Sequence, residues 1–289
     1  MRNFTVLLFT VVGVIGFSFQ NHLPENIMAQ EGLRIMSYNI RYDNPGDGER
    51  AWDRRREEVA SLIRFYDPDL IGLQEVLHGQ LTYLETQLTG YGRIGVGRDD
   101  GKQAGEYSPV FYRKSQLELL DHGTFWLSET PDQPSVGWDA SMERIATWGQ
   151  FRRNEPGDTI FFLNTHFDHR GEQARQEGAR LIRRWVIDHA TNHPVVVTGD
   201  FNSHPTSEPY RILTKGGELR DAYTVSENPS VGPDRSFSGF VVTDSLPGDR
   251  IDYVFVGAQA KVKRHAIISS FRTGYYPSDH LPVVADVVW

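Results

Sequence analysis

The most constraining stretch of this sequence is a short apolar run that ends in polar residues. Val195–Val197 are three consecutive β-branched residues, a pattern typical of a buried strand. The run stops at Gly199, and Asp200 and Asn202 follow it two positions apart. Because side chains alternate along an extended chain, this pair would project from the same side of the strand end. Gly, Asp and Asn also form ordinary turns, so the stretch alone predicts either a turn or a site at the carboxyl edge of a sheet.

Composition limits the chemistry that this chain can perform. The 289 residues are 39% hydrophobic and 12% aromatic, which is enough for a sizeable core. There are no cysteines, which excludes disulfides, zinc–thiolate sites, iron–sulfur clusters and thiol catalysis. Proteins that bind long nucleic acids usually carry a basic surface, whereas the net charge of this chain is −8. No strong basic nucleic-acid surface is therefore expected.

The N-terminal segment is predicted to be an export signal. Arg2 precedes an apolar run over residues 4–19, which is shorter than the roughly 20 residues of a membrane-spanning helix. Ala29 offers a small residue for cleavage. We therefore expect residues 1–29 to be removed, residues 30–289 to form a single catalytic domain, and the mature protein to be periplasmic or extracellular without a stable membrane partner. An uncleaved membrane anchor is the alternative, and the sequence leaves the oligomeric state open.

Hydrophobic periodicity predicts strands and helices in alternation. Expected strands cover residues 33–40, 70–73, 91–96, 108–112, 117–127, 144–152, 159–165, 195–198, 251–256, 261–270 and 283–288, and expected helices cover 53–65, 78–88, 171–190 and 208–213. Asp53 is expected to cap the first helix, and the run Arg54–Arg56 to form a solvated face of it. A strand–helix–strand unit occurs in each half of the chain, which predicts two facing sheets whose polar strand ends meet at one rim.

Polar residues that follow the predicted strands suggest a site for a hard metal ion. They are Asn39, Glu75, His166, Asp200, Asn202, Asp252, Asp279 and His280. Each alone is commonly a turn, cap or structural residue. Together, carboxylates, amides and histidines without thiols suit Mg²⁺, or Mn²⁺. Such a set fits phosphate-ester hydrolysis, in which a metal polarises a phosphoryl oxygen while a base activates water.

Six short blocks in the chain carry a resemblance to a known superfamily. They are Ser37–Arg41, Leu73–Val76, Asn164–His166, Gly199–Asn202, Arg250–Val254 and Ser278–His280. In this order they resemble the endonuclease/exonuclease/phosphatase superfamily, in a bacterial subgroup near its deadenylase-like branch. The resemblance implies an α+β fold like that of deoxyribonuclease I. This fold is a four-layer αββα sandwich of two mixed, mainly antiparallel sheets packed face to face, with helices outside.

The same resemblance implies a metal site and a substrate pocket. Glu75 resembles the principal Mg²⁺ ligand, supported by Asn39 and Asp279. Arg41 resembles a phosphate-binding arginine. Arg144 and His169 are further candidates for contact with the substrate.

It also implies the catalytic groups. Asp200 and Asn202 resemble the pair that orients water and the scissile phosphate, and His166 resembles a histidine that contacts phosphate or assists the leaving group. His280 resembles the catalytic histidine, with Asp252 holding its tautomer. Either Asp200 or His280 serves as the general base.

These observations predict a Mg²⁺-dependent phosphoesterase that hydrolyses a phosphodiester or a phosphomonoester. Export and the net charge of −8 favour a small or nucleotide-like substrate, such as a nucleotide, a sugar phosphate or a phospholipid headgroup. The likeness of the blocks Tyr38–Asn44 and Trp52–Arg56 to the deadenylase-like branch implies a 3′–5′ exoribonuclease as the alternative. A non-catalytic module that binds phosphate ligands is the alternative from another class, because a fold does not determine a function.

Overall fold

Two six-stranded sheets account for all the strands among the described residues, which are 1, 32–190, 192–272 and 274–289 of a computed structural model. The first sheet has the order β11 (Lys261–Ile267), β12 (Val283–Val288), β1 (Leu33–Asn39), β2 (Leu70–Gln74), β4 (Val110–Arg113), β3 (Tyr91–Ile94). The second has the order β5 (Leu117–Trp126), β6 (Ile145–Arg153), β7 (Thr159–His166), β8 (Val195–Asp200), β10 (Asp252–Gly257), β9 (Leu219–Asp221). The predicted export signal lies, apart from Met1, outside the described residues and stays a prediction.

Both sheets are mixed and mainly antiparallel, as predicted. Among the described strands, β1 with β2 and β7 with β8 are the parallel neighbours, and every other pair is antiparallel. A helix joins each parallel pair: α1 (Trp52–Tyr66) lies between β1 and β2, and α3 (Glu172–Ala190) lies between β7 and β8. The repeated strand–helix–strand unit of the sequence is therefore present in both sheets.

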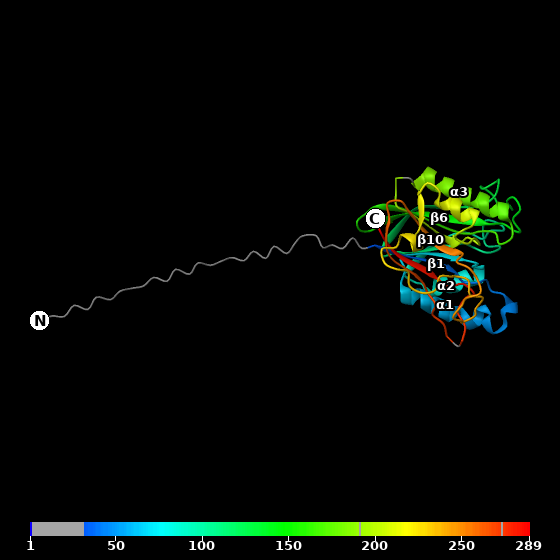
Figure 1. The fold of residues 1–289 in the computed structure, drawn as a ribbon, viewed down its shortest axis with the longest axis horizontal. Coiled ribbons are helices and arrows are strands. Elements are labelled where there is room, and N and C mark those ends of the chain that lie inside the picture. The colour runs from blue at the N-terminus through cyan, green and yellow to red at the C-terminus, as the bar shows by residue number, and fades with distance from the viewer. Residues whose placement is uncertain (2–31, 191, 273) are drawn as a thin grey trace. The chain divides into compact units, whose positions relative to one another are not determined.

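Strand alternation places the apolar side chains in three layers. Ile35 of β1 and Val196 of β8 belong to the core between the sheets. Their neighbours point outward: Met36 packs with α1 and α2 (His78–Gln87), and Val197 packs with α3 and α4 (Glu208–Thr214). Figure 1 shows α1 and α2 on one side of the paired sheets and α3 on the other. The predicted four-layer αββα sandwich is confirmed for residues 32–289 outside the gaps at 191 and 273.

The beginning of α1 corrects two expectations from the sequence. A 3₁₀ helix, η1 (Pro45–Arg50), lies between the first expected strand and the first expected helix and leads directly into α1. Ala51 is therefore the N-cap, and Asp53 lies in the first turn, where its negative charge suits the positive end of the helix dipole. The predicted solvated face is wrong for Arg55, which is only 1% exposed.

The shortest elements escaped prediction because they are too short to show a hydrophobic period. β9 and α5 (Ala222–Val225) have 3 and 4 residues. The segment 226–249 contains neither helix nor strand and meets the rest of the fold through isolated bridges such as Phe237 with His280. Within the described part of the chain, no helix combines the length and apolarity needed to cross a membrane.

A buried amide joins the two sheets below their polar rim. Asn164 of β7 donates to the carbonyl oxygens of Leu73 at 2.7 Å and Pro109 at 3.0 Å, both on the opposite side of the interface. Its own oxygen accepts from Gln74 Nε2 at 2.7 Å and Thr198 Oγ1 at 3.1 Å. A side chain at Gly72 would overlap Asn164 and Thr198, so glycine permits this close approach. The side-chain amide of Asn164 thus forms four hydrogen bonds, and four buried groups have it as a partner.

We predict that Asn164→Ala lowers the free energy of unfolding by at least about 2 kcal/mol, because it leaves buried polar groups unpaired at the sheet interface. Asn154→Ala is the matched control, since the amide of Asn154 makes an exposed bond to the Ser115 carbonyl oxygen. Urea denaturation followed by circular dichroism measures both variants. Equal, small losses for the two would show that Asn164 does not join the sheets energetically.

Candidate active site

The predicted site residues meet at one edge shared by both sheets. Asn39 ends β1 and Glu75 directly follows β2, while His166 and Asp200 end β7 and β8. β10 runs antiparallel to β8, so its first residue, Asp252, lies opposite Asp200. Parallel strands contribute their carboxyl ends and antiparallel strands their amino ends, which explains how residues far apart in sequence converge here. Asp279 and His280 reach the same edge from the segment that precedes β12.

Strained backbone marks the turns that leave these strands. Arg41, Glu75 and Asn202 have positive φ angles of 58°, 61° and 45°, in the left-handed region that non-glycine residues seldom occupy. Each of the three lies within two residues of a strand end. Such strain tends to persist at functional sites, where the surrounding structure holds it in place.

Asn39 connects the carboxylates of the two sheets. Its Nδ2 donates to Glu75 Oε1 and to Asp200 Oδ2, each at 3.0 Å, and lies 3.4 Å from His280 Nε2. Its Oδ1 accepts from the backbone N–H of Arg41 at 3.0 Å. The second oxygen of Glu75 accepts from the N–H of Tyr42 at 3.1 Å. The orientation of Glu75 is therefore set by the chain segment that follows β1.

The pKa values of Asp200 and His280 are both raised by their buried surroundings. Burial and the neighbouring Asp252 carboxylate raise the pKa of Asp200 to about 7. Burial alone lowers the pKa of His280, but Asp252, Asp200 and Asp279 outweigh it and raise that pKa well above its ordinary value. Asp252 Oδ2 lies 2.9 Å from His280 Nδ1, and Asp200 Oδ2 lies 3.7 Å from His280 Nε2. The carboxylates on both sides of the ring thus favour the protonated form of His280.

His166 has the opposite character. Burial and the nearby Arg144 and Arg98 lower its pKa well below the ordinary value, so the ring is neutral. Asn202 Nδ2 lies 3.2 Å from His166 Nε2 and also donates to the Phe167 carbonyl oxygen at 3.0 Å. The backbone N–H of Asn202 donates to Asp200 Oδ1 at 2.9 Å. Asn202 therefore orients both His166 and Asp200, and the predicted role of Asp200 and Asn202 in orienting water and the scissile phosphate stays a prediction.

Glu106 and Arg98 join the site without any signal in the sequence. Glu106 Oε2 lies 3.8 Å from His166 Nδ1, and Glu106 pairs with both terminal nitrogens of Arg98 at 2.8 and 3.0 Å. Both residues lie in a polar stretch that reads as an ordinary surface loop. Local sequence could not reveal them, because their proximity to His166 depends on the packing of β3–β4 against β6–β7.

The three predicted substrate residues are all tied to neighbouring carboxylates or rings. Arg41 Nε and Nη2 bind Asp47 at 3.0 Å each, while its Nη1 lies 3.8 Å from Asp279 and 4.0 Å from Glu75. Arg144 is buried and contacts Asp168 and His169. Among the described residues, Arg144 Nη1 has no hydrogen-bond partner. The structure thus places Arg41 beside the carboxylates Asp279 and Glu75. It places Arg144 and His169 together, close enough to His166 to lower its pKa.

Three ligand atoms in this cluster are close enough to hold one metal ion. Single ligand atoms of Glu75, Asp200 and His280 all lie within 4.8 Å of one another. The carboxylate oxygens of Glu75 and Asp200 suit a hard divalent cation, whereas His280 could be a ligand only in its neutral form. Burial raises the pKa of both Asp200 and Asp279, so a positive charge here would stabilise their ionised forms. The predicted ligand Asp279 lies to one side, against Arg41, and is outside this group of three.

Arg55 is a third residue, after Glu106 and Arg98, whose contact with the site was not predicted from the sequence. Its guanidinium donates to the carbonyl oxygens of Ile40 at 2.5 Å and Pro277 at 3.2 Å, which belong to the two segments that carry Asn39 and His280. A signal for its burial exists: Arg55 lies three residues after Trp52 and four before Val59, on the apolar stripe of α1.

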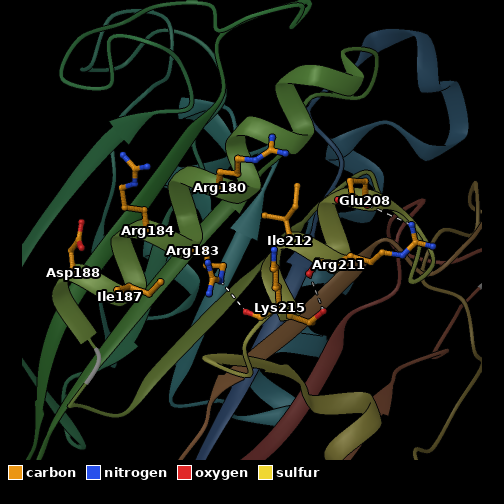
Figure 2. A pocket seen from close by; sticks show the side chains of 10 residues that line it. Arg180, Arg183, Arg184, Ile187, Asp188, Glu208, Arg211, Ile212 and Lys215 are labelled. Carbon is orange, nitrogen blue, oxygen red and sulfur yellow. Dashed lines mark hydrogen bonds and ion pairs between the residues drawn. The ribbon is translucent and has the colours of Figure 1, made fainter.

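A separate groove of about 760 Å³ lies between α3 and α4. Figure 2 shows its basic lining, which consists of Arg180, Arg183, Arg184, Arg211 and Lys215. Glu177, Glu218 and Glu208 pair with Arg180, Arg183 and Arg211, respectively. None of the lining residues belongs to the strand-end cluster. The groove is largely a salt-bridged helix surface and adds nothing to the chemistry of the rim.

Comparison with known proteins identifies the family. The model of the Endonuclease/Exonuclease/phosphatase family matches residues 36–280. This chain belongs to that family. The match spans all six blocks noted in the sequence, so the resemblance is confirmed. Family membership makes the protein a hydrolase of phosphoester bonds, and members are typically metal-dependent, which agrees with the cluster of Glu75, Asp200 and His280.

Similar solved structures come from bacteria. An endonuclease/exonuclease/phosphatase from Bacteroides vulgatus is 42% identical, with a TM-score of 0.84, over 88% of this chain and 98% of that chain. A mannosyl-6-phosphatase from Bacteroides thetaiotaomicron is 38% identical, with a TM-score of 0.83, over 89% of this chain and 100% of that chain. The CCR4-Not complex 3′–5′-exoribonuclease subunit Ccr4 of Saccharomyces cerevisiae is 22% identical over 91% of this chain, which spans 39% of that protein.

We predict that Glu75→Gln weakens the binding of Mn²⁺ at least about tenfold, because it removes one charged oxygen ligand while keeping the size of the side chain. Electron paramagnetic resonance of free Mn²⁺ during a titration measures the affinity. Glu85→Gln is the control, since Glu85 is 41% exposed at its side chain and pairs with Arg93. Equal affinities for both variants and the unmodified protein would place the metal elsewhere.

Proposed function

We propose that this protein is a Mg²⁺-dependent phosphoesterase that acts on a small phosphate ester, with a sugar phosphate as the leading substrate class. The observation that carries the proposal is the cluster of the half-buried Glu75 with the buried Asp200 and His280, in which one polar atom of each lies within 4.8 Å of the others. Phosphate-ester hydrolysis needs metal ligands, a positive charge near the phosphate and a base. The cluster supplies carboxylate oxygens from both sheets, the imidazolium form of His280 and the Asp200 carboxylate, whose pKa is raised.

In this proposal Glu75 holds the cation, which would polarise a phosphoryl oxygen and neutralise charge on the phosphate, and the Asn39 amide nitrogen orients the Glu75 carboxylate. His280 is protonated and buried, so its Nε2–H is available to a phosphoryl oxygen. Asp252 stabilises that cation and fixes the ring through the 2.9 Å contact at Nδ1. His280 therefore acts here as an electrostatic stabiliser rather than as the base.

Asp200 is the better candidate for the general base. Its pKa of about 7 is close to the operating pH of a neutral medium, which suits proton transfer from a water molecule. The N–H of Asn202 holds Oδ1, which leaves Oδ2 directed toward Asn39, His166 and His280. This division of labour favours Asp200 over His280 as the general base, a choice that the sequence left open.

Three observations support a small substrate. The solved mannosyl-6-phosphatase is 38% identical and is matched over its entire length. The net charge of −8 opposes non-specific attraction to long nucleic acids. The three basic residues near the rim, Arg41, Arg98 and Arg144, all contact carboxylates of the protein itself, so no continuous basic track extends from the cluster along these residues.

We predict that the purified protein hydrolyses hexose 6-phosphates and p-nitrophenyl phosphate in the presence of Mg²⁺ and loses this activity in excess chelator. Release of phosphate and of p-nitrophenol measures turnover. The panel also contains bis-p-nitrophenyl phosphate, mononucleotides and an oligoadenylate, and we expect kcat/KM to be highest for a small phosphomonoester.

Each alternative has its own outcome in the same panel. Preferred shortening of the oligoadenylate would favour a 3′–5′ exoribonuclease, the activity named for the 22% identical Ccr4 protein. Binding of phosphate ligands without turnover would favour a non-catalytic module. Turnover that is indifferent to the chelator would contradict metal dependence and refute the proposal.

We predict that His280→Ala lowers kcat at least about 100-fold, because it removes the positive charge that faces the substrate phosphate. His204→Ala is the matched control, since His204 is an exposed residue whose ring contacts Thr206. Steady-state kinetics on p-nitrophenyl phosphate compares the two. A His280→Ala enzyme with the kcat of the unmodified protein would refute the role of this histidine.

A further inference from the structure

A buried arginine lies beneath the rim and binds almost entirely to backbone. Arg55 of α1 is 1% exposed, and among the described residues it forms no ion pair with a carboxylate. Burying an unpaired cation is costly unless its donors are satisfied by hydrogen bonds. The guanidinium of Arg55 is satisfied by main-chain carbonyl oxygens, which is unusual for the middle residue of an Arg-Arg-Arg run on a surface helix.

The partners of Arg55 come from three chain segments. Nη1 donates to the carbonyl oxygens of Ile40 at 2.5 Å and Pro277 at 3.2 Å. Nη2 donates to those of Arg41 at 2.7 Å and Tyr42 at 3.4 Å, and Nε donates to that of Arg50 at 2.8 Å. The planar guanidinium therefore ties residues 40–42 to Pro277 and to the end of η1. The rings of Trp52 and Phe240, 5.1 and 5.8 Å from the guanidinium carbon, hold it in the cation–π range.

The first of these segments controls Glu75. Residues 40–42 follow Asn39, and the N–H of Tyr42 binds Glu75 Oε2 at 3.1 Å. The N–H of Arg41 binds Asn39 Oδ1 at 3.0 Å, which directs the Asn39 amide nitrogen toward Glu75 and Asp200. A displacement of this segment would therefore move the hydrogen-bond donors that orient the two acidic residues.

The second segment controls His280. Pro277 precedes Ser278, whose Oγ donates to the Asn39 carbonyl oxygen at 2.7 Å and accepts from the His280 N–H at 3.2 Å. The approach of the His280 ring to Asp252 and Asp200 depends on this turn. Arg55 is the side chain that contacts both segments directly, from a helix that contributes no group to the cluster itself.

We propose that Arg55 is a positioning residue for the phosphoester hydrolysis at this site: it holds the segment after β1 and the segment before β12 in register, so that Glu75 and His280 face the same substrate phosphate. The inference rests on the proposed function. Five donors in a fixed planar fork allow one side chain to bind several carbonyl oxygens at once, and an ammonium group on a flexible stem cannot reproduce that geometry. Misplacement of reacting groups by about 1 Å can cost on the order of 100-fold in rate.

The deciding variant is Arg55→Lys, which keeps the charge and the helix propensity but loses the fork. Arg54→Lys and Arg56→Lys are matched controls on the same helix, with side chains that are 61% and 45% exposed. Circular dichroism and urea denaturation give the folded fraction of each variant. We expect Arg55→Lys to lower kcat at least about tenfold per folded molecule with KM changed less than about threefold, because the loss lies in alignment rather than in substrate contact.

Two further readouts separate positioning from stability. Millimolar guanidinium ion, too dilute to denature, is expected to restore part of the kcat of Arg55→Ala and to leave the unmodified protein unaffected. The proton on His280 Nδ1, hydrogen-bonded to Asp252, is expected far downfield in the ¹H NMR spectrum, and its loss in Asp252→Asn assigns it. This resonance should shift or broaden in Arg55→Lys and not in the controls.

The outcomes separate this inference from the proposed function. A folded Arg55→Lys protein with the kcat of the unmodified protein and an unchanged His280 resonance overturns the positioning role. Loss of stability alone, with normal kcat per folded molecule, overturns it equally. If the unmodified protein hydrolyses none of the phosphate esters, the proposed function fails, and the His280 resonance still decides whether Arg55 positions this segment. If Arg55→Ala does not fold, Arg55→Lys carries the test.

Discussion

The hydrogen bonds between the two sheets are the constraint on which the site depends. Asn39 and Glu75 belong to one sheet, and His166, Asp200 and Asp252 to the other. Asn164 binds backbone of the first sheet from within the second, one layer below the bond between Asn39 and Asp200. A polar bond in an apolar interface is satisfied in only one register, so it sets the relative position of the sheets more sharply than apolar contact does.

Charge is the second constraint, because the rim gathers more carboxylates than it has cations to pair with them. Asp200, Asp252 and Asp279 are buried around one imidazolium, with Arg41 at the edge. Burial raises the pKa of Asp200 and Asp279, whereas the carboxylates together raise the pKa of His280. The buried carboxylates repel one another, and a bound divalent cation would reduce this repulsion. The same residues are therefore well suited to bind a metal and a phosphate.

Much of the fold and most of the cluster could be predicted from the sequence, because both depend on short-range patterns. Apolar runs such as Val195–Val197 indicated the buried strands, although only the structure shows that Val196 faces the other sheet and Val197 the helices. Polar residues directly after buried runs indicated the strand ends that meet at the rim. The N-cap of α1 was misplaced because η1, whose conformation is set by the Asn44 side chain, is too short to show a period.

By itself, the sequence determined the family, the order of the longer strands and helices, and the eight polar residues of the rim. Only the tertiary structure decided their partners: that Glu106 faces His166, that Asp279 pairs with Arg41, and that Asp200 joins Glu75 and His280. It also placed the buried Arg55 between two loops: that of Ile40, 15 residues away along the chain, and that of Pro277, 222 residues away. The physical reason is that local side-chain periodicity specifies which face of an element is buried, whereas a contact between distant segments depends on how the sheets, helices and loops pack together.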